Sequence, residues 1–156
     1  MRQTETDDKI QEKQAILIVD DSEMNRAILT DMLQEDYRTL EAENGVQAVE
    51  LIRKYSDAID LVLLDITMPE MDGFEVLAIM NKYHLIDNIP VIMISSENSE
   101  SYIRKAYELG VSDYISRPFD ARVVFQRVFN TIKLYAKQRR LIRLVTNQIY
   151  EKEKNN

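Results

Sequence analysis

The stretch Leu61-Val62-Leu63-Leu64-Asp65 decides the fold. Four consecutive apolar residues of this kind are typical of a short strand that is buried on both faces, as in a parallel sheet covered by helices. A carboxylate at the end of such a strand is costly to bury unless a cation or a hydrogen-bond donor compensates it. Asp65 is therefore the first candidate functional residue.

Similar apolar runs precede and follow this one, and they alternate with helical patterns. Strands are predicted over residues 15–20, 37–42, 61–65, 90–95 and 113–116. Helices are predicted to begin near residues 22, 45, 73, 100 and 120, with Ser22, Asp72 and Asp120 as N-caps. Five successive strand–helix units predict an α/β fold, in which a parallel sheet carries helices on both faces.

Polar residues end several of these strands, and the carboxyl ends of parallel strands meet at the edge of the sheet where ligands bind. The residues in question are Asp20, Asp21, Asp65, Ser95 and Arg117. Three gathered carboxylates repel one another without a cation, and Mg²⁺ or Mn²⁺ prefers such oxygen ligands. A hydroxyl and a fixed positive charge beside them suit an oxyanion, so Asp65 is a candidate nucleophile for phosphoryl transfer.

A less specific interpretation stays open for each residue alone. An aspartate at a strand end more often caps a helix or forms a turn. Ser95 alone would indicate nothing, because serine commonly ends strands. The functional interpretation therefore depends on the residues forming one set.

The composition excludes several classes of protein. The 156 residues are 45% hydrophobic and 30% charged, which fits one compact domain with some length left over, and the net charge of −7 argues against direct nucleic-acid binding. No cysteine is present, so disulfides and thiolate metal sites are excluded. Neither a signal peptide nor an apolar run of ~18 residues is apparent. We therefore expect a soluble cytoplasmic protein without a membrane partner.

Four segments together resemble the receiver domain of bacterial two-component response regulators. They are residues 16–22 (ILIVDDS), 63–73 (LLDITMPEMDG), 90–95 (PVIMIS) and 114–119 (YISRPF). The resemblance covers about residues 14–132. It implies a flavodoxin-like, doubly wound sheet of five parallel strands in the order 2-1-3-4-5.

The resemblance also implies roles for the acidic residues. Asp65 falls at the phosphoacceptor position. Asp21, Asp65 and the backbone carbonyl of Thr67 fall at the positions that bind Mg²⁺, while Asp20 falls where a metal-bound water is held. Such a domain catalyses only its own phosphorylation and dephosphorylation, so we do not expect an enzyme that acts on outside substrates.

A second group of positions corresponds to the conformational switch. Ser95 falls at the switch hydroxyl, and Tyr114 falls at the aromatic residue that turns inward behind it. Arg117 stands where the family nearly always has lysine, and a guanidinium is not interchangeable with an ammonium point charge. We expect Asp65 to be phosphorylated although Arg117 replaces the usual lysine. We expect the replacement to affect how the positive charge at this position is coupled to the conformational switch. The bond before Pro118 is commonly cis in this family.

The last predicted helix continues without glycine or proline to Lys154, about twice the length needed to cover the sheet. Val128, Tyr135, Ile142 and Ile149 recur every seven residues, which indicates a coiled coil, although a solvated basic helix is an alternative. We expect a flexible lead-in over residues 1–13, the receiver over 14–132, and a linker helix over 133–156 toward an output domain. The linker resembles helices that lead into HD-GYP or related cyclic-di-GMP output domains.

Three functional hypotheses follow. In the first, a sensor histidine kinase donates a phosphoryl group to Asp65, and the switch alters a homodimer formed through the fourth and fifth helices and the C-terminal helix. In the second, the site is degenerate and the chain is a phosphorylation-independent docking or dimerisation module. In the third, which lacks an apparent general acid, the protein is a Mg²⁺-dependent phosphatase.

Overall fold

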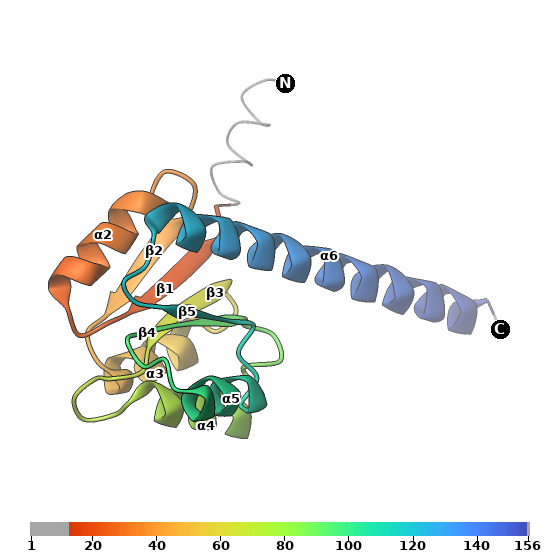
Figure 1. The fold of residues 1–156 in the computed structure, drawn as a ribbon. Helices are drawn as coiled ribbons and strands as arrows, with labels where there is room; N and C mark the ends of the chain where they lie inside the picture. Colours follow the sequence, from red (N-terminus) through yellow and green to blue (C-terminus); the bar gives the residue numbers. More distant parts are fainter. Residues whose placement is uncertain (1–12, 156) are drawn as a thin grey trace.

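The computed structural model describes residues 13–155, and over these residues strands alternate with helices (Figure 1). The strands are β1 (Ala15–Val19), β2 (Arg38–Ala42), β3 (Leu61–Asp65), β4 (Val91–Ser95) and β5 (Asp113–Ser116). The helices are α2 (Glu23–Leu33), α3 (Gly45–Tyr55), α4 (Gly73–Lys82), α5 (Glu100–Glu108) and α6 (Ala121–Lys154). The alternation predicted from the apolar runs is confirmed.

All strand pairs are parallel, and the sheet has the order β2-β1-β3-β4-β5. This is the order that the resemblance implied, so the doubly wound fold is confirmed. β3 lies at the centre of the sheet, and each of its residues is buried. The sequence order reverses between β1 and β3, which is where ligands bind in folds of this type.

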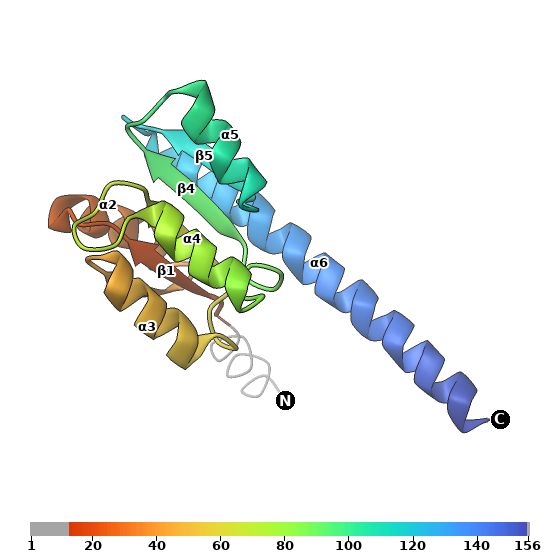
Figure 2. The same cartoon turned by 90° about the horizontal axis from the view of Figure 1, so that it is seen from below.

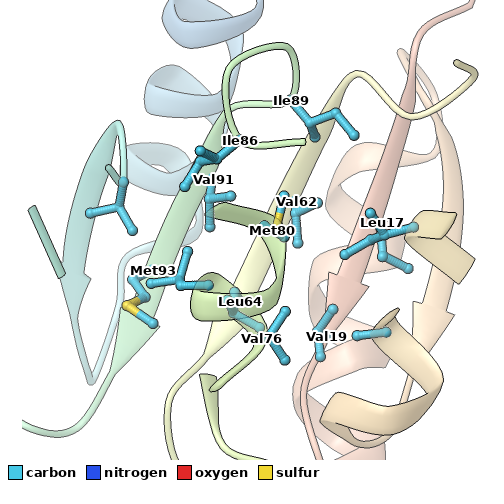
Figure 3. Close-up of a cluster of buried hydrophobic side chains, with 14 of the residues drawn as sticks. Leu17, Val19, Val62, Leu64, Val76, Met80, Ile86, Ile89, Val91 and Met93 are labelled. Atoms are coloured by element: carbon cyan, nitrogen blue, oxygen red, sulfur yellow. The ribbon is translucent and has the colours of Figure 1, made fainter. Parts of the chain in front are cut away.

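Helices cover both faces of the sheet, with α3, α4 and α5 on one face and α2 and α6 on the other (Figure 2). Alternate strand residues point to opposite faces: Leu17, Val62 and Val91 pack toward α4, as Figure 3 shows. Ile16 and Leu63 pack toward α2 and α6. Because both faces are buried, the central strands need apolar residues at every position.

Strand boundaries differ from the predictions by one residue. β1 stops at Val19 because the side chain of Asp20 turns back to accept a hydrogen bond from the amide of Ser22. β2 begins after Tyr37, whose amide still donates to Leu33 at the end of α2. β4 begins after Pro90, which has no N–H to donate to a sheet.

Helix starts follow the predicted caps. Side chains accept backbone hydrogen bonds at the N-caps Ser22, Asp72 and Asp120. Asn44 is the N-cap of α3, and its side chain accepts from the amide of Gln47. These caps begin α2, α3, α4 and α6 just after strands end. The helices therefore begin at the same edge of the sheet as Asp20, Asp65 and Arg117.

α6 is one continuous helix that extends far beyond the sheet (Figures 1 and 2). Its buried residues are Val124, Val128 and Ile132, which pack against the sheet. The heptad position Val128 therefore belongs to the core of this domain and not to a coiled coil. Ile142 and Ile149, farther along, are 67% and 54% exposed.

Two arginines fix the direction of α6. Arg127 forms a two-pronged ion pair with Asp113 of β5, with N–O distances of 2.7 and 2.9 Å. Arg139 lies 3.4 Å from Asp60 and donates to the carbonyl of Asn88 at 2.9 Å. The second contact holds the helix at the opposite edge of the sheet from the candidate site.

Two sequence predictions concern the ends of the chain. The predicted flexible lead-in falls on residues 1–13, of which 1–12 lie outside the described part. No helix among residues 13–155 has the length and apolar character needed to cross a membrane.

Candidate functional site

Three carboxylates gather at the carboxyl edge of the sheet. β1 and β3 are hydrogen-bonded neighbours with Val19 opposite Leu64, so the residues that follow these positions come side by side. Oxygens of Asp20, Asp21 and Asp65 all lie within 4.8 Å of one another. The structure thus brings together the three acids that the sequence analysis singled out.

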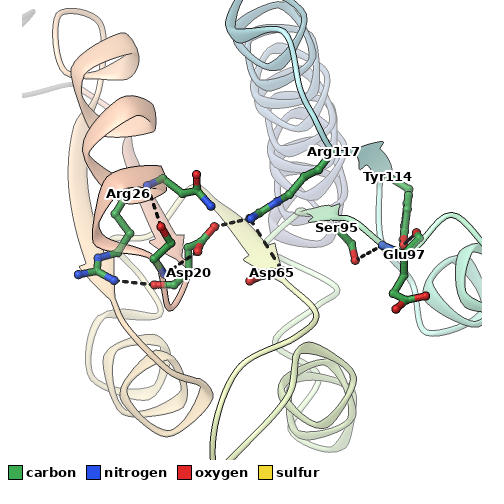
Figure 4. A network of polar contacts seen from close by, with 9 residues as sticks. Asp20, Arg26, Asp65, Ser95, Glu97, Tyr114 and Arg117 are labelled. Atoms are coloured by element: carbon green, nitrogen blue, oxygen red, sulfur yellow. Dashed lines mark hydrogen bonds and ion pairs between the residues drawn. The ribbon is translucent and has the colours of Figure 1, made fainter.

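The acids differ in burial and in support. Asp20 is buried, and its Oδ1 accepts from the amide of Ser22 at 2.9 Å. The guanidinium of Arg26 donates to the backbone carbonyl of Asp20 at 2.7 Å (Figure 4). It also donates to the carboxylate of Glu41. Asp21 is exposed, so it is the member of the set that solvent reaches. Sequence reasoning did not identify Arg26, because its partner is a backbone atom.

Asp65 is 6% exposed, and its environment disfavours the charged form. Burial raises the pKa of Asp65 to about 6, and the charges of Asp20 and Asp21 act in the same direction. The positive charge of Arg117 and a hydrogen bond from the backbone of Thr67 oppose this rise in pKa. A perturbed carboxyl group at a strand end is a mark of functional sites.

Gly73 allows α4 to begin close to this carboxylate. A Cβ atom at Gly73 would lie 2.4 Å from the carbonyl oxygen of Asp65. The amide of Gly73 donates to the carbonyl of Ile66 at 2.8 Å, which closes the loop between β3 and α4. The glycine of the predicted loop therefore fixes the geometry around Asp65.

Arg117 supplies a positive charge at the same edge. Its backbone amide donates to the carbonyl of Ser95 at 2.8 Å, and the bond to Pro118 is cis, as the resemblance implied. Its Nη2 forms an ion pair with Asp20 and lies 3.8 Å from Oδ1 of Asp65 (Figure 4). Arg117 thus bridges two of the three acids.

Ser95 and Tyr114 form a chain of contacts beside the acids. The hydroxyl of the buried Ser95 accepts a hydrogen bond from the amide of Glu97 at 3.1 Å (Figure 4). The buried Tyr114 donates its hydroxyl proton to the carbonyl of Glu97 at 2.5 Å. Burial also raises the pKa of Tyr114. Both side chains therefore meet at the segment that follows β4.

A pocket of about 540 Å³ opens beside the acids, between the loop after β3 and helix α5. Thr67, Glu97 and Lys105 are among its lining residues. The Lys105 ammonium lies 4.4 Å from the centre of the Phe74 ring, a cation–π contact. Lys105 was not identified from the sequence, since nothing near it in the chain indicates this contact.

The donor atoms of the acidic cluster fit a hard divalent cation. Asp20, Asp21 and Asp65 offer only oxygen ligands, and the exposed Asp21 leaves room for water. Mg²⁺ is usually held in this way, by one or two carboxylates and several waters. The site is therefore compatible with Mg²⁺.

Comparison with known proteins identifies the family. A family model of the response regulator receiver domain matches residues 16–129. The chain belongs to the response regulator receiver family. The matched residues include β1 from Ile16 onward, the other four strands and the acidic cluster of this receiver domain.

Individual relatives agree with this assignment. The chemotaxis protein CheY of Bacillus subtilis is 38% identical over 119 residues, which cover 75% of this chain and 96% of that protein. A probable cyclic di-GMP phosphodiesterase of Vibrio cholerae is 39% identical over 113 residues, 72% of this chain. The chain spans only 25% of that longer relative.

A solved structure of a relative shows the same fold. The crystal structure of a CheX–CheY–BeF₃–Mg²⁺ complex from Borrelia burgdorferi matches with a TM-score of 0.69 and 36% identity. The match covers 75% of this chain and 87% of that chain. The receiver domain described here therefore shares its architecture with the chain matched in that BeF₃–Mg²⁺ complex.

Proposed function

We propose that this receiver domain accepts a phosphoryl group on Asp65 from the phosphohistidine of a sensor histidine kinase. The observation that carries the proposal is the placement of Asp65. It lies at the end of the central strand, shares a cluster of oxygens with Asp20 and Asp21, and has the guanidinium of Arg117 3.8 Å away. Asp20 shares the acidic cluster and the contact with Arg117, but Asp65 alone of the three acids ends the central strand.

The reaction is a group transfer. A carboxylate oxygen of ionised Asp65 forms a bond to phosphorus as the bond between phosphorus and the donor nitrogen breaks, and the leaving imidazole keeps the electron pair. Mg²⁺ bound by Asp21, Asp65 and the carbonyl of Thr67, with Asp20 holding a bound water, would neutralise charge on the phosphoryl oxygens. Arg117 adds a second positive charge at the same place. The domain catalyses only its own phosphorylation and dephosphorylation in this proposal.

The signal then passes through Ser95 and Tyr114. The Ser95 hydroxyl can rotate to donate its proton to a phosphoryl oxygen, which draws the segment after β4 toward the site. Tyr114 is joined to that segment through the carbonyl of Glu97, so it responds to the movement. The change in conformation is limited by how much better the phosphoryl group binds the active state.

A kinase has to bring its phosphohistidine to Asp65, so it must cover the surface that borders the site. An apolar pocket of about 560 Å³ lies there, and Ile28, Phe119 and Pro118 line it together with Arg117. Met24, nearby on α2, is 73% exposed. We propose this apolar surface as the kinase contact, and a cytoplasmic location follows because the kinase phosphorylates its histidine there from ATP.

The domain organisation is also part of the proposal. Residues 14–132 form the receiver, and residues 133–156 lead toward an output domain beyond the chain described here. Support comes from the Vibrio cholerae relative, in which the matched region is a quarter of a protein named as a probable cyclic di-GMP phosphodiesterase. A cyclic-di-GMP output is the output class that this likeness favours.

A homodimer would connect the switch to the output. The distal part of α6 exposes Leu141, Ile142, Val145 and Ile149, each at least half exposed. Pairing through these residues and through the face of α5 and α6 would allow phosphorylation to change the association. The same exposed residues support the second candidate, a docking or dimerisation module that does not depend on phosphorylation.

One experiment separates the two candidates. The protein and its Asp65→Asn variant are incubated with Mg²⁺ and beryllofluoride, and the molecular mass in solution is measured by light scattering. The switch predicts a change in association that requires both beryllofluoride and Asp65. Dimers of equal stability in all samples would instead support the docking module.

A further inference from the structure

Arg26 holds the backbone between two of the three acids. Its Nη1 donates to the carbonyl oxygen of Asp20 at 2.7 Å (Figure 4). This carbonyl and the amide of Asp21 belong to one peptide unit, which is planar and rigid. The direction of the carbonyl therefore sets the direction in which the chain continues into Asp21.

Arg26 is itself fixed from two sides. Its backbone amide donates to the carbonyl of Ser22 at 3.0 Å, in the first turn of α2. Its Nε donates to the carboxylate of Glu41 in β2 at 3.3 Å. The side chain is only 13% exposed, and a planar guanidinium donates in several fixed directions at once. One side chain thus joins α2, β2 and the turn that follows β1.

Asp20 and Asp21 differ in how far they depend on this contact. Asp20 is buried, its amide donates to the carbonyl of Ala42 at 3.1 Å, and its Oδ1 accepts from the amide of Ser22. Asp21 is exposed, so packing does not restrain its side chain. The placement of the Asp21 carboxylate within 4.8 Å of the other two acids therefore depends on its backbone.

The positive charge of Arg26 acts against a cation at this site, because like charges repel, although Glu41 compensates part of that charge. A role through charge alone would make a cation bind more tightly when Arg26 is replaced by a neutral residue. A role in holding Asp21 predicts weaker binding. The two roles therefore predict changes of opposite sign.

We propose that Arg26 is a positioning residue that favours Mg²⁺ over Ca²⁺ at the acidic cluster. Mg²⁺ requires nearly ideal octahedral geometry with short bonds to oxygen, whereas Ca²⁺ accepts longer bonds and irregular arrangements. A carboxylate that is held in one place benefits Mg²⁺ binding, and the same carboxylate free to turn costs Ca²⁺ binding little. This inference rests on the proposed function, because it takes Asp21 as a ligand of the cation.

Binding of the two cations to the intact chain tests the proposal. Dissociation constants for Mg²⁺ and Ca²⁺ are measured by calorimetric titration of the wild type, Arg26→Gln and Arg26→Lys, whose residues have similar helix propensities. We expect Mg²⁺ to bind about tenfold more weakly to Arg26→Gln, as for other groups that orient metal ligands, and Ca²⁺ binding to change less than about twofold. Arg26→Lys keeps the charge and should show a smaller loss of Mg²⁺ affinity.

Arg38→Gln is the matched control. Arg38 also donates to a backbone carbonyl, that of Lys13 at 3.0 Å, and it lies opposite Ala15 at the start of β1, away from the acids. The same change from arginine to glutamine there removes one charge and one hydrogen bond to a carbonyl. It should leave the preference for Mg²⁺ over Ca²⁺ unchanged.

The order of the backbone supplies a measurement without any cation. In the cation-free chain, the ¹⁵N order parameter of the Asp21 amide should fall in Arg26→Gln and stay at the wild-type value in Arg38→Gln. If Arg26→Gln does not fold, Arg26→Lys carries the same comparison.

Tighter Mg²⁺ binding in Arg26→Gln, or equal losses for Mg²⁺ and Ca²⁺, would overturn the positioning role and leave the proposed function intact. An unchanged order parameter of the Asp21 amide would overturn the positioning role as well. Failure of the wild-type chain to bind Mg²⁺ would instead overturn the proposed function, and this inference with it.

Discussion

The guanidinium of Arg117 contacts Asp20 and lies 3.8 Å from the carboxylate of Asp65, the residue at the end of the central strand. One cation therefore compensates two buried acids that come from neighbouring strands, β1 and β3. The compensation is incomplete, because the pKa of Asp65 is still raised to about 6. The site is thus built to gain stability when a further cation enters it.

Removing the charge of Asp65 should stabilise the domain in the absence of divalent cations. The pKa of about 6 in the folded state lies above the ordinary aspartate value of 3.8, so the folded state binds more protons than the unfolded state between these values. Stability from this group therefore falls as pH rises from about 4 to about 6. We expect Asp65→Asn to raise the free energy of unfolding at pH 7 by about 3 kcal/mol at most, from ~1.4 kcal/mol per pH unit.

Urea unfolding at pH 7 and near pH 4 measures this effect. The gain from Asp65→Asn should be present at pH 7 and largely absent near pH 4, where Asp65 is protonated in the folded state. Asp57→Asn, which alters an exposed acid away from the site, is the matched control. It should leave the free energy of unfolding nearly unchanged at both pH values. A gain that is the same at both pH values would show that the charge of Asp65 is not its source.

Mg²⁺ should stabilise the folded domain through the acidic cluster. A ligand that binds only the folded state at one hundred times its dissociation constant adds about 2.7 kcal/mol to the free energy of unfolding. Thermal unfolding followed by circular dichroism, with and without Mg²⁺, reports this gain. In Asp21→Asn the gain should shrink or disappear while stability without Mg²⁺ changes little, because Asp21 is exposed. Equal stabilisation of both proteins by Mg²⁺ would exclude Asp21 as a ligand.

Loss of the Arg139 contact should loosen the distal part of α6. Arg139 joins the helix to Asp60 and Asn88, beyond which α6 has no buried residues. Helices without tertiary contacts are marginal in water, so Arg139→Ala should speed amide exchange in residues 140–154. The global free energy of unfolding should change by less than about 1 kcal/mol, as for a partly exposed ion pair. Hydrogen exchange with mass detection measures both effects.

Arg140→Ala is the control for this experiment. Arg140 is exposed, and the same change from arginine to alanine alters the helix propensity by the same amount. Its amide exchange should remain close to that of the wild type. If the two variants behaved alike, the Arg139 contact would not be what holds the helix.

Tyr114→Phe should release the segment that follows β4. The substitution removes the hydrogen bond from the Tyr114 hydroxyl to the carbonyl of Glu97 and leaves that carbonyl without this donor. We expect a loss of about 0.5–1.5 kcal/mol in the free energy of unfolding, together with faster amide exchange in residues 96–99. Tyr102→Phe, which alters an exposed tyrosine whose ring packs against Phe74, is the matched control. Unaltered exchange in Tyr114→Phe would indicate that Tyr114 does not hold this segment.

The apolar runs were sufficient to predict the strands because both faces of the sheet are buried. The apolar run that ends at Asp65 fits a strand that is covered on both faces. The meeting of Asp20 and Asp21 with Asp65, by contrast, required β1 to lie next to β3, and that order came from the resemblance and not from spacing. The structure confirms the order and brings the acids together.

Contacts between distant side chains could not be predicted. The contact of Arg139 with Asp60 spans 79 residues and depends on how α6 is rotated against the sheet. The heptad pattern was also ambiguous. The same spacing of apolar residues occurs in a helix that packs against its own domain and in a helix that pairs with a second helix in a coiled coil. Val128 proved to belong to the domain core, while Ile149 remains exposed.

Peptide mapping shows whether Asp65 is the residue that is phosphorylated. The intact chain is incubated with Mg²⁺ and a small acyl phosphate, digested, and analysed by mass spectrometry beside Asp65→Asn and Arg117→Lys. Our account predicts one phosphoryl group on the peptide that contains Asp65, in the wild type and in Arg117→Lys but not in Asp65→Asn. Modification of the lysine variant alone, or of a residue other than Asp65, would contradict it.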